Sequence, residues 1–498
     1  MSPYRAEVAL SVLLISPRVP QIRHRGTVLV RPMGLFSLVA SLRSMGIRAN
    51  VLDLLRQPMS DSDLIERVKS ENWRMFGLTC NVYTRFEAIA TANLLRKAFP
   101  DRPIIAGGPH FSKCAEDALQ HVHAIDVIVR GEGEEVIQKL VPAMLYGGNW
   151  SNLNGISFRR DGHIQHNPDA PRIADLDSLP IFTDFRYEDY PEVVAMQALE
   201  AKKVPGLGIV TTRGCPHRCI FCSSSDGVYR TRSPESVVNE MEQWMDRFPM
   251  VGGFNIYDLT FAADAAYARA VCEEIMARQL HICWWAETRV DIDLDLLDLM
   301  AASGCKALSV GVESGSPRVL KAINKKIDLE MVYDFAARCD SLGIRLDVFL
   351  MLSLPTETAD DLKMTLGLAE RLLRDYKRVL YPGGGPSVTS IYSGSPLERI
   401  ARAKGVIPPD FSWHKPFYEP SNIELFCSPY VPIYRENLSH QDLKLAVRKV
   451  SYQIDTKYLG WGGFVRRTVS KIFARDRTLG EKVRAAKNLI ESFFSQSV

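Results

Sequence analysis

Three cysteines are crowded into one short stretch of the chain, and their spacing is the strongest chemical signal in the sequence. Cys215, Cys219 and Cys222 stand in the string TTRGCPHRCIFCSSS, a C-x3-C-x2-C pattern. Thiolates are soft ligands that bind iron–sulfur clusters, zinc or copper(I). Zinc normally needs a fourth cysteine or histidine, but His217 has poor reach inside the loop and no later C-x-x-C pair follows. Three ligands on a short loop favour a [4Fe–4S] cluster with one open iron over a zinc loop or incidental thiols.

The rest of the composition is that of an ordinary globular protein. Of 498 residues, 46% are hydrophobic and 24% charged, and 61 basic against 58 acidic residues leave a net charge of +3. This balance gives no argument for a nucleic-acid partner. The apolar run at the N-terminus is too short for a signal peptide, and no stretch approaches the roughly 18 to 20 apolar residues that span a bilayer. We therefore expect a cytoplasmic protein, in which the seven scattered cysteines are core residues rather than disulfide partners.

The first part of the chain, residues 1–150, alternates strand-like and helix-like patterns. Apolar strand patterns cover 8–15, 49–54, 75–80, 104–106 and 127–129, and helical patterns follow each of them. Alternation of this kind implies a parallel sheet that is covered on both faces. Five such strands predict a doubly wound, flavodoxin-like α/β domain.

A second alternation follows a proline-containing linker. Residues 151–205 read as this linker, with a small hairpin over 155–164. Residues 206–400 then carry strand patterns at 208–212, 253–257, 282–286, 307–312, 346–352 and 387–392. Six βα units predict a partial (β/α)6 barrel, and the cysteine loop follows its first strand, at the catalytic face. Residues 401–498 are expected to form a mostly helical C-terminal region.

The cysteine loop and the strand ends after it resemble the radical S-adenosylmethionine (SAM) superfamily. The strings that carry the resemblance are NIYDLTFAAD, WWAETRVD, SVGVESGSPRVLKAINK, FLMLSLPTET and SIYSGSPL, in strand order after the loop. In that family SAM chelates the open iron through its amino and carboxylate groups. The resemblance implies SAM contacts from Phe221, Asp258, Arg289, Glu313 and Ser314, with an ordinary capping or surface role as the alternative for each polar residue.

Two positions depart from the family pattern. Tyr257 stands where many members carry the first Asp of D-D-x-F, so only Asp258 and Phe261 match that motif. Leu354 follows Ser353 where a glycine is usual.

The first domain resembles the cobalamin-binding-like domain that precedes many radical SAM barrels. The strings RPMGLFSLVASLRSMGIRANVLDL, AGGPH and VIVRGEGEE carry this resemblance. Gly107, Gly108, Gly131 and Gly133 follow strands at the edge where doubly wound sheets bind ligands, and glycine lets a ligand approach the backbone. We therefore expect these four glycines to contact cobalamin, with a vestigial domain that binds no corrin as the alternative.

The usual cobalt ligand of cobalamin domains is missing from this chain. The motif D-x-H-x-x-G is absent, and His24, His110, His121 and His123 stand in other contexts. The resemblance then implies that the lower face of cobalt meets the loop CNVYTRF, with Asn81, Tyr83 and Thr84 as candidate contacts.

The basic tail offers a possible membrane contact. Residues 457–490 hold nine Lys or Arg against two Asp or Glu, interleaved with Tyr458, Trp461, Phe464 and Phe473. Basic amphipathic helices with aromatic residues can lie on membranes, but a solvated helix packed on its own domain is the favoured interpretation.

The resemblance implies radical chemistry on a small molecule or lipid. Reductive cleavage of SAM would produce a 5′-deoxyadenosyl radical that abstracts hydrogen from an unactivated carbon, with electrons from flavodoxin or ferredoxin. With cobalamin, the expected reaction is methylation of carbon or phosphorus, and a second SAM replaces the methyl group. The alternatives are a non-methylating cyclase or oxidoreductase, as on a tetrapyrrole, and an iron–sulfur binding protein without turnover. Catalytic residues and the substrate are not identified by any motif.

Overall fold

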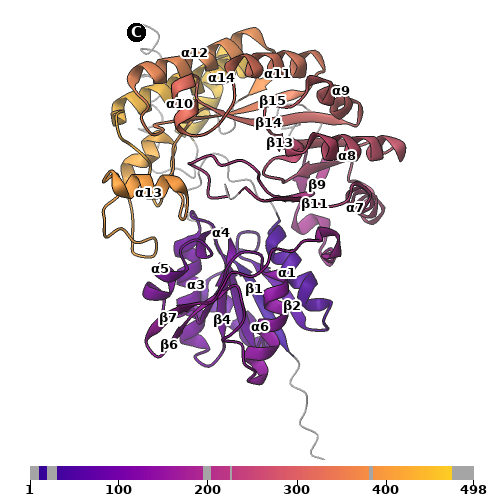
Figure 1. Ribbon diagram of the computed structural model, residues 1–498, viewed down its shortest axis with the longest axis vertical. Helices are drawn as coiled ribbons and strands as arrows, with labels where there is room; N and C mark the ends of the chain where they lie inside the picture. Colours follow the sequence, from indigo (N-terminus) through magenta and orange to yellow (C-terminus); the bar gives the residue numbers. More distant parts are fainter. Residues whose placement is uncertain (1–9, 19–30, 195–203, 225–226, 381–384, 474–498) are drawn as a thin grey trace, which may run out of the picture.

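The protein consists of two sheet-centred bodies stacked on one another (Figure 1). The computed structural model describes residues 10–18, 31–194, 204–224, 227–380 and 385–473, with the side chains of 380 and 459–473 excepted. The N-terminal body lies at one end, the barrel at the other, and the C-terminal region runs from the barrel back to the first body through α13 (Pro396–Ala403).

The first body is built on a seven-stranded sheet of order β2-β1-β3-β4-β5-β6-β7. Five strands are parallel and two are antiparallel. The parallel strands are β1 (Ser11–Ser16), β2 (Arg48–Asp53), β3 (Met75–Thr79), β4 (Ile104–Gly107) and β5 (Val127–Val129). Their order, 2-1-3-4-5, is that of a flavodoxin-like fold, which confirms the predicted fold class.

Helices cover both faces of this sheet, as the apolar strands require. In β1, Val12 and Leu14 pack into the core under α1 (Met33–Arg43) and α6 (Glu134–Tyr146). Leu13 and Ile15 face the opposite core, under α2 (Asp61–Glu71), α3 (Arg85–Ala98) and α5 (Ala115–His121). Successive residues of a strand point to opposite faces, so a fully apolar strand is stable only between two helical layers.

The hairpin expected in the linker is present and belongs to the first sheet. Strands β6 (Ile156–Arg160) and β7 (His163–His166) extend it past β5. Further along the linker, Phe182 and Phe185 pack on Phe36 of α1, and Phe185 also contacts Trp244 of α7 (Pro234–Arg247). These rings join the cores of the two bodies into one continuous apolar cluster.

The second body is an open barrel of parallel strands. The order β9-β12-β13-β14-β15 follows the chain, and both β16 and β17 pair with β15. The bounds are β9 (Pro205–Ile209), β12 (Gly253–Ile256), β13 (Cys283–Thr288), β14 (Cys305–Glu313), β15 (Arg345–Leu352), β16 (Val379–Leu380) and β17 (Ser387–Val388). The short β8 (Glu192–Val193) pairs antiparallel with β9. The predicted partial barrel is confirmed, with a sixth strand shorter than expected.

Helices on the outer surface connect these strands. They are α7, α8 (Ala265–Ala277), α9 (Leu294–Ala302), α10 (Pro317–Ala322), α11 (Leu329–Ser341) and α12 (Ala359–Asp375). Capping fixes where several of them begin. At α12, Thr358 and Asp361 form a reciprocal capping box that satisfies two orphan amide groups.

The C-terminal region contains α13, a long irregular stretch and α14 (His440–Phe473), which packs on α12. At the start of the basic stretch, Lys457 donates to the Leu373 carbonyl at 2.6 Å and Tyr458 donates to the Val379 carbonyl. These two residues pack on their own domain. The other aromatic residues of the basic stretch, Trp461, Phe464 and Phe473, and residues 474–490 lie outside the described side chains and residues. No described helix is long and apolar enough to cross a bilayer.

A buried arginine fixes the C-terminal region to the first body. Arg85, at the start of α3, is fully buried, and its Nε donates to the Trp413 carbonyl at 2.8 Å. Its other guanidinium nitrogens donate to the carbonyls of Val82 and Tyr430. One side chain thus satisfies carbonyl groups from two distant parts of the chain.

Removing this guanidinium should destabilise the junction. We expect Arg85→Met to lower the free energy of unfolding by about 3 kcal/mol, because buried carbonyls lose their donors at about 1–3 kcal/mol each. Thermal unfolding followed by circular dichroism measures the effect. Arg160→Met, at a largely exposed side chain, is the control and should leave the transition in place. Equal transitions for both variants would contradict the structural role of Arg85.

Candidate functional site

The cysteine loop lies between two short strands at the mouth of the barrel. Strands β10 (Thr212–Gly214) and β11 (Tyr229–Thr231) form an antiparallel hairpin after β9, and the loop connects them. Cys219 is buried, whereas Cys215 and Cys222 are half-buried. The cysteine loop therefore follows the first barrel strand, as predicted. Strand β10 lies between β9 and the loop along the chain, so the loop stands beyond the end of β9.

Backbone contacts hold the loop against other parts of the barrel. The Ile220 amide donates to the Ile323 carbonyl at 3.1 Å, and the Ile220 carbonyl accepts from the Leu397 amide at 2.8 Å. Asn324 donates through its side chain to the Arg218 carbonyl at 2.8 Å. The turn after α10 and the start of α13 therefore fix the position of the cysteines.

The charge around the thiols suits an anionic cluster. Burial raises the pKa of Cys215 and Cys222, and the neighbouring thiols raise it further. The positive charge of Lys325 acts in the opposite direction on both cysteines, and that of Arg289 on Cys215. Buried thiolates need such cations or bound metal to offset their charge. Three thiols on one short loop, beside two cationic side chains, suit a [4Fe–4S] cluster.

Asp258 fixes the point at which the hairpin leaves the barrel. Its buried carboxylate accepts hydrogen bonds from the amides of Thr211 and Thr212, at 2.8 and 3.0 Å, and from the Thr211 hydroxyl at 2.5 Å. Burial raises the pKa of this carboxyl group, while the hydrogen bonds from the threonines lower it. The observed contacts are those of a positioning residue, and the SAM contact predicted for Asp258 stays a prediction.

Arg289 and Glu313 form a buried charged group at the ends of β13 and β14. Arg289 makes a two-pronged pair with Asp291, both at 2.8 Å, and donates to the Lys325 carbonyl at 2.8 Å. Glu313 pairs with the Lys325 ammonium at 2.9 Å and has a φ of +71°. A left-handed glutamate is uncommon and persists where its surroundings fix it, often at functional sites. The structure thus brings Arg289 and Glu313 together around Lys325.

Phe221 lies beside this charged group, whereas Ser314 is buried behind it. The Lys325 ammonium lies 6.0 Å from the centre of the Phe221 ring. The Ser314 hydroxyl is fully buried, 3.1 Å from the Thr365 hydroxyl, and accepts from the Ser316 amide at 3.1 Å. Ser314 is therefore engaged in local structure, and its predicted contact with SAM, like that of Phe221, stays a prediction.

Sequence reasoning missed two charged residues at this edge. Lys325 lies in the string SVGVESGSPRVLKAINK, which does not single it out, yet its ammonium pairs with Glu313. Glu287, near the end of β13, was also overlooked. Burial, and secondarily the negative charge of Glu313, raise its pKa to about 7. A carboxyl group that titrates near neutrality at a barrel mouth can exchange a proton there. The sequence signal for Glu287 is its position two residues before Arg289, in the string WWAETRVD at the end of a barrel strand.

The departure at Tyr257 has a structural explanation. Its hydroxyl donates to Glu192 of β8 at 3.1 Å, and Glu192 also pairs with the buried Arg31 at 3.3 Å. An added Cβ at Gly208 would lie 2.2 Å from the Tyr257 ring, so the ring occupies space that only glycine leaves open. Tyr257 therefore supports the edge of the barrel where the family motif has an acid.

Two arginines of the cysteine hairpin are paired with the glycine loop of the first body. Arg213 of β10 lies 2.6 Å from Glu134, and Arg230 of β11 binds Glu132 through both guanidinium prongs, at 2.6 and 2.9 Å. Arg213 also lies 3.6 Å from Glu132. We call this group of four side chains the hairpin clamp. It connects the hairpin that carries the cysteines to the loop that contains Gly131 and Gly133.

A cavity of about 570 Å³ lies between the first sheet and this hairpin. The predicted Gly107, Gly108, Gly131 and Gly133 all line it, together with residues of α1, the linker and the hairpin. At Gly131, which has a φ of +76°, an added Cβ would meet no atom within 4 Å and would extend into open space. The volume is typical of a small-ligand pocket and suits the nucleotide tail of cobalamin.

The other residues predicted to contact cobalamin do not line this cavity. Asn81 accepts from the amides of Tyr83 and Thr84, at 2.9 and 3.1 Å, and the Tyr83 hydroxyl lies 2.9 Å from that of Tyr392. The loop is thus in contact with the segment after β17, and its role as the floor under cobalt stays a prediction. His110 is turned away, toward Ser393 at 3.1 Å, and His24 lies outside the described residues.

Filling the cavity from Gly131 should prevent cobalamin from binding. We expect Gly131→Val to lose at least tenfold in affinity for cobalamin, because the new side chain occupies the pocket, while iron–sulfur absorbance is preserved. The control is Gly147→Val, because Gly147 has a nearly identical φ of +78° and open space but lies outside the cavity. Gel filtration with absorbance spectra measures retained corrin. Equal retention in both variants would place cobalamin elsewhere.

Sequence comparison identifies two families along the chain. The profile of the Radical SAM superfamily matches residues 209–369, which contain the cysteine hairpin and the barrel strands up to β15. The profile of the B12 binding domain matches residues 26–141, which contain the cavity-lining glycines. The predicted cofactors, a [4Fe–4S] cluster with SAM and cobalamin, are confirmed by these two matches.

Several known proteins are similar to this chain in sequence or in structure. An uncharacterized methyltransferase of Pyrococcus horikoshii is 27% identical over 388 residues, covering 77% of this chain and 81% of the relative. An anaerobic magnesium-protoporphyrin IX monomethyl ester cyclase of Synechocystis is 29% identical, covering 64% of this chain and 63% of the relative. The structure of the radical SAM methyltransferase TsrM from Kitasatospora setae has the same fold, with a TM-score of 0.65 at 20% identity over 80% of this chain and 79% of that one.

The fold, the cysteine hairpin and the glycine-lined cavity agree with these matches. The predicted resemblance is thereby confirmed, and so is the prediction that the protein is an enzyme. The chain thus carries a B12 binding domain followed by a radical SAM domain, and it resembles the cobalamin-dependent radical SAM enzymes in both.

Proposed function

We propose that this protein is a methyltransferase that replaces hydrogen by a methyl group on an unactivated carbon of a small molecule. The observation that carries the proposal is the hairpin clamp, which joins the cysteine loop to the cavity-lining glycine loop. A radical formed at the barrel mouth and a methyl donor held by the first sheet would thus act on one substrate between them. The uncharacterized methyltransferase of Pyrococcus horikoshii, which aligns over most of both chains, supports methyl transfer.

We assign the cluster to Cys215, Cys219 and Cys222. When bound, the reduced cluster supplies the electron that cleaves SAM, and cobalamin supplies the methyl group that is transferred. Lys325 and Arg289 offset the negative charge beside the cysteines, and Glu313, which pairs with Lys325, is our candidate contact for the amino group of SAM. Asp258 holds Thr211 and Thr212 so that the hairpin leaves the barrel at a fixed angle. The chain's own contribution is thus positioning and charge compensation.

The full reaction consumes two molecules of SAM. One gives 5′-deoxyadenosine and methionine, and the hydrogen removed from the substrate ends on 5′-deoxyadenosine. The other gives its methyl group and leaves as S-adenosylhomocysteine. The two electrons required come from a reduced protein such as flavodoxin or ferredoxin, which we propose as a partner.

Radical chemistry without methyl transfer is the second candidate. Its support is the 29% identity to the magnesium-protoporphyrin cyclase of Synechocystis, over a smaller share of both chains. The two candidates differ in their products from SAM. Methyl transfer requires 5′-deoxyadenosine together with S-adenosylhomocysteine, whereas cyclisation or oxidation requires 5′-deoxyadenosine alone.

An anaerobic assay with reconstituted cluster, cobalamin and a chemical reductant tests the proposal. We expect the wild-type chain to form both products from SAM. Cys219→Ala should lose 5′-deoxyadenosine formation completely, because the cluster loses a ligand, and Gly131→Val should lose most of its S-adenosylhomocysteine. Cys427→Ala, at a buried thiol packed beneath β17, is the control and should retain both products. Liquid chromatography with mass spectrometry quantifies them.

Two outcomes would contradict this account. Continued 5′-deoxyadenosine formation by Cys219→Ala would reject the cluster assignment. Wild-type protein with bound cobalamin that makes 5′-deoxyadenosine but no S-adenosylhomocysteine would reject methyl transfer and favour the cyclase-like reaction.

A further inference from the structure

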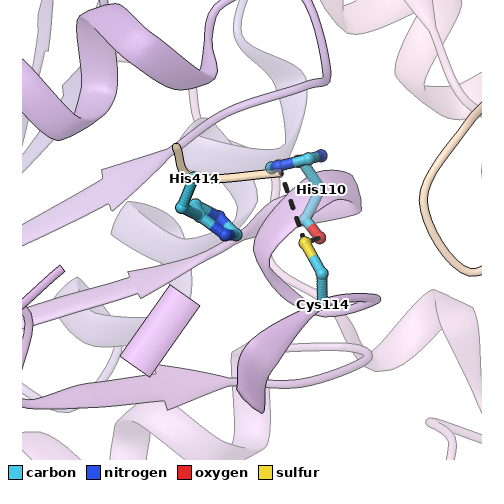
Figure 2. Close-up of side chains that lie close together, drawn as sticks. All are labelled: His110, Cys114 and His414. Atoms are coloured by element: carbon cyan, nitrogen blue, oxygen red, sulfur yellow. Dashed lines mark hydrogen bonds between the residues drawn. The ribbon is translucent and has the colours of Figure 1, made fainter. Parts of the chain in front are cut away.

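Two histidines and a cysteine converge at the junction between the first body and the C-terminal region. His110 lies on α4 (Gly108–Phe111), Cys114 precedes α5, and His414 belongs to the irregular stretch after α13. One ligand atom from each side chain lies within 4.8 Å of the other two (Figure 2). None of the three belongs to the cysteine hairpin or to the cavity.

The remote nitrogen of each imidazole is engaged in a way that orients the ring. His414 Nδ1 lies 2.7 Å from the Asp117 carboxylate, and His110 Nδ1 lies 3.1 Å from the Ser393 hydroxyl. With Nδ1 occupied, Nε2 is the nitrogen that each ring leaves for a metal, and that of His110 lies 3.5 Å from the Cys114 sulfur. Metal-binding histidines are oriented by such outer partners, most often a carboxylate or a hydrogen-bonding oxygen.

One of the inward nitrogens has no hydrogen-bond partner among the described residues. The His414 side chain has no exposed surface, and its Nε2 makes no hydrogen bond there. A buried polar atom without a partner costs roughly 1–3 kcal/mol, so it calls for an explanation. His414 stacks on Phe111, with ring centres 5.7 Å apart and ring planes 7° apart. This packing covers a face of the imidazole but gives Nε2, at its edge, no partner.

The separation of the sulfur from one of the imidazoles matches that in a tetrahedral zinc site. With Zn–S near 2.3 Å and Zn–N of about 2.0–2.1 Å, tetrahedral geometry separates a sulfur and a nitrogen ligand by roughly 3.6 Å. The observed distance between Cys114 Sγ and His110 Nε2 is 3.5 Å. Beside the thiol, a pocket of about 460 Å³ lined by Cys114, Asp117 and Trp413 gives an ion and a water molecule access.

We propose that His110, Cys114 and His414 bind one Zn²⁺ ion, with water as the fourth ligand. The ion would connect the first body, through His110 and Cys114, to the C-terminal region, through His414. His414 directly follows Trp413, whose carbonyl accepts from Arg85. Asp117 acts as a positioning residue through His414 Nδ1. The site is independent of the methyl-transfer reaction, because its ligands touch neither the cavity nor the cysteine hairpin.

The full-length protein with its cluster assembled tests this site. After anaerobic incubation with one equivalent of zinc and desalting, metal analysis should show one zinc per chain. Absorption at the zinc K-edge should show one sulfur and two imidazole ligands, and iron does not contribute to that signal. Asp117→Asn should weaken zinc binding by about 10- to 100-fold, the loss typical of an outer partner. His414→Gln should abolish stoichiometric binding.

A neighbouring histidine provides the matched control. His123 lies two residues after the helix that carries Asp117, has an exposed side chain and is not one of the converging ligands. We expect His123→Gln to bind zinc like the wild type. Wild-type protein that retains no zinc would overturn the proposal. So would a zinc spectrum dominated by sulfur, which would place the ion on the cysteine loop. The wild-type spectrum decides the question even if His414→Gln does not fold.

Discussion

The pairing of Glu132 and Glu134 with Arg213 and Arg230 is the interaction on which the arrangement of this enzyme depends. Glu132 lies in the glycine loop of the first sheet, Glu134 begins the helix α6 directly after it, and the two arginines flank the cysteine loop of the barrel. All four side chains are largely withdrawn from solvent, so water screens their attraction less than at an open surface. Removing one partner would leave a partly buried charge uncompensated, which is far more costly than losing an exposed pair.

This clamp explains why two independent sheets can serve one reaction. Loops at the carboxyl ends of parallel strands carry the ligand sites in both folds. In this chain those edges face each other, and the apolar linker residues Phe182 and Phe185 join the cores behind them. Asp258 then fixes the hairpin on the barrel side through Thr211 and Thr212. The positions of both ligand sites therefore follow from a small set of buried polar contacts.

Much of this could be predicted from the sequence because the signals are local. The C-x3-C-x2-C loop, the strand periodicity and the glycines after β4 and β5 are each readable within a few residues. The clamp could not be predicted, since Glu132 and Arg230 are far apart in the chain and nothing in either string specifies the other. Glu287 was missed for a related reason, because its raised pKa comes from burial and from Glu313 on another strand.

The contacts of the residues predicted by resemblance also depend on partners from elsewhere in the chain. Arg289 and Glu313 are brought together around Lys325, whereas Ser314 is hydrogen-bonded behind the strand and Tyr83 is in contact with Tyr392. Tyr257 replaces a family acid because Glu192 of β8 gives its hydroxyl a partner. Tertiary partners decide such roles, and the sequence motif does not contain them.

The cysteine hairpin borders the cavity to which we assign cobalamin, so the cluster and the cobalt should lie close together. Electron paramagnetic resonance of protein that holds both the reduced cluster and cob(II)alamin measures this directly. The account predicts that the cobalt signal is broadened by the cluster spin, and that the broadening disappears in Cys219→Ala protein that retains cobalamin. A spectrum equal to the simple sum of the two separate signals would contradict it.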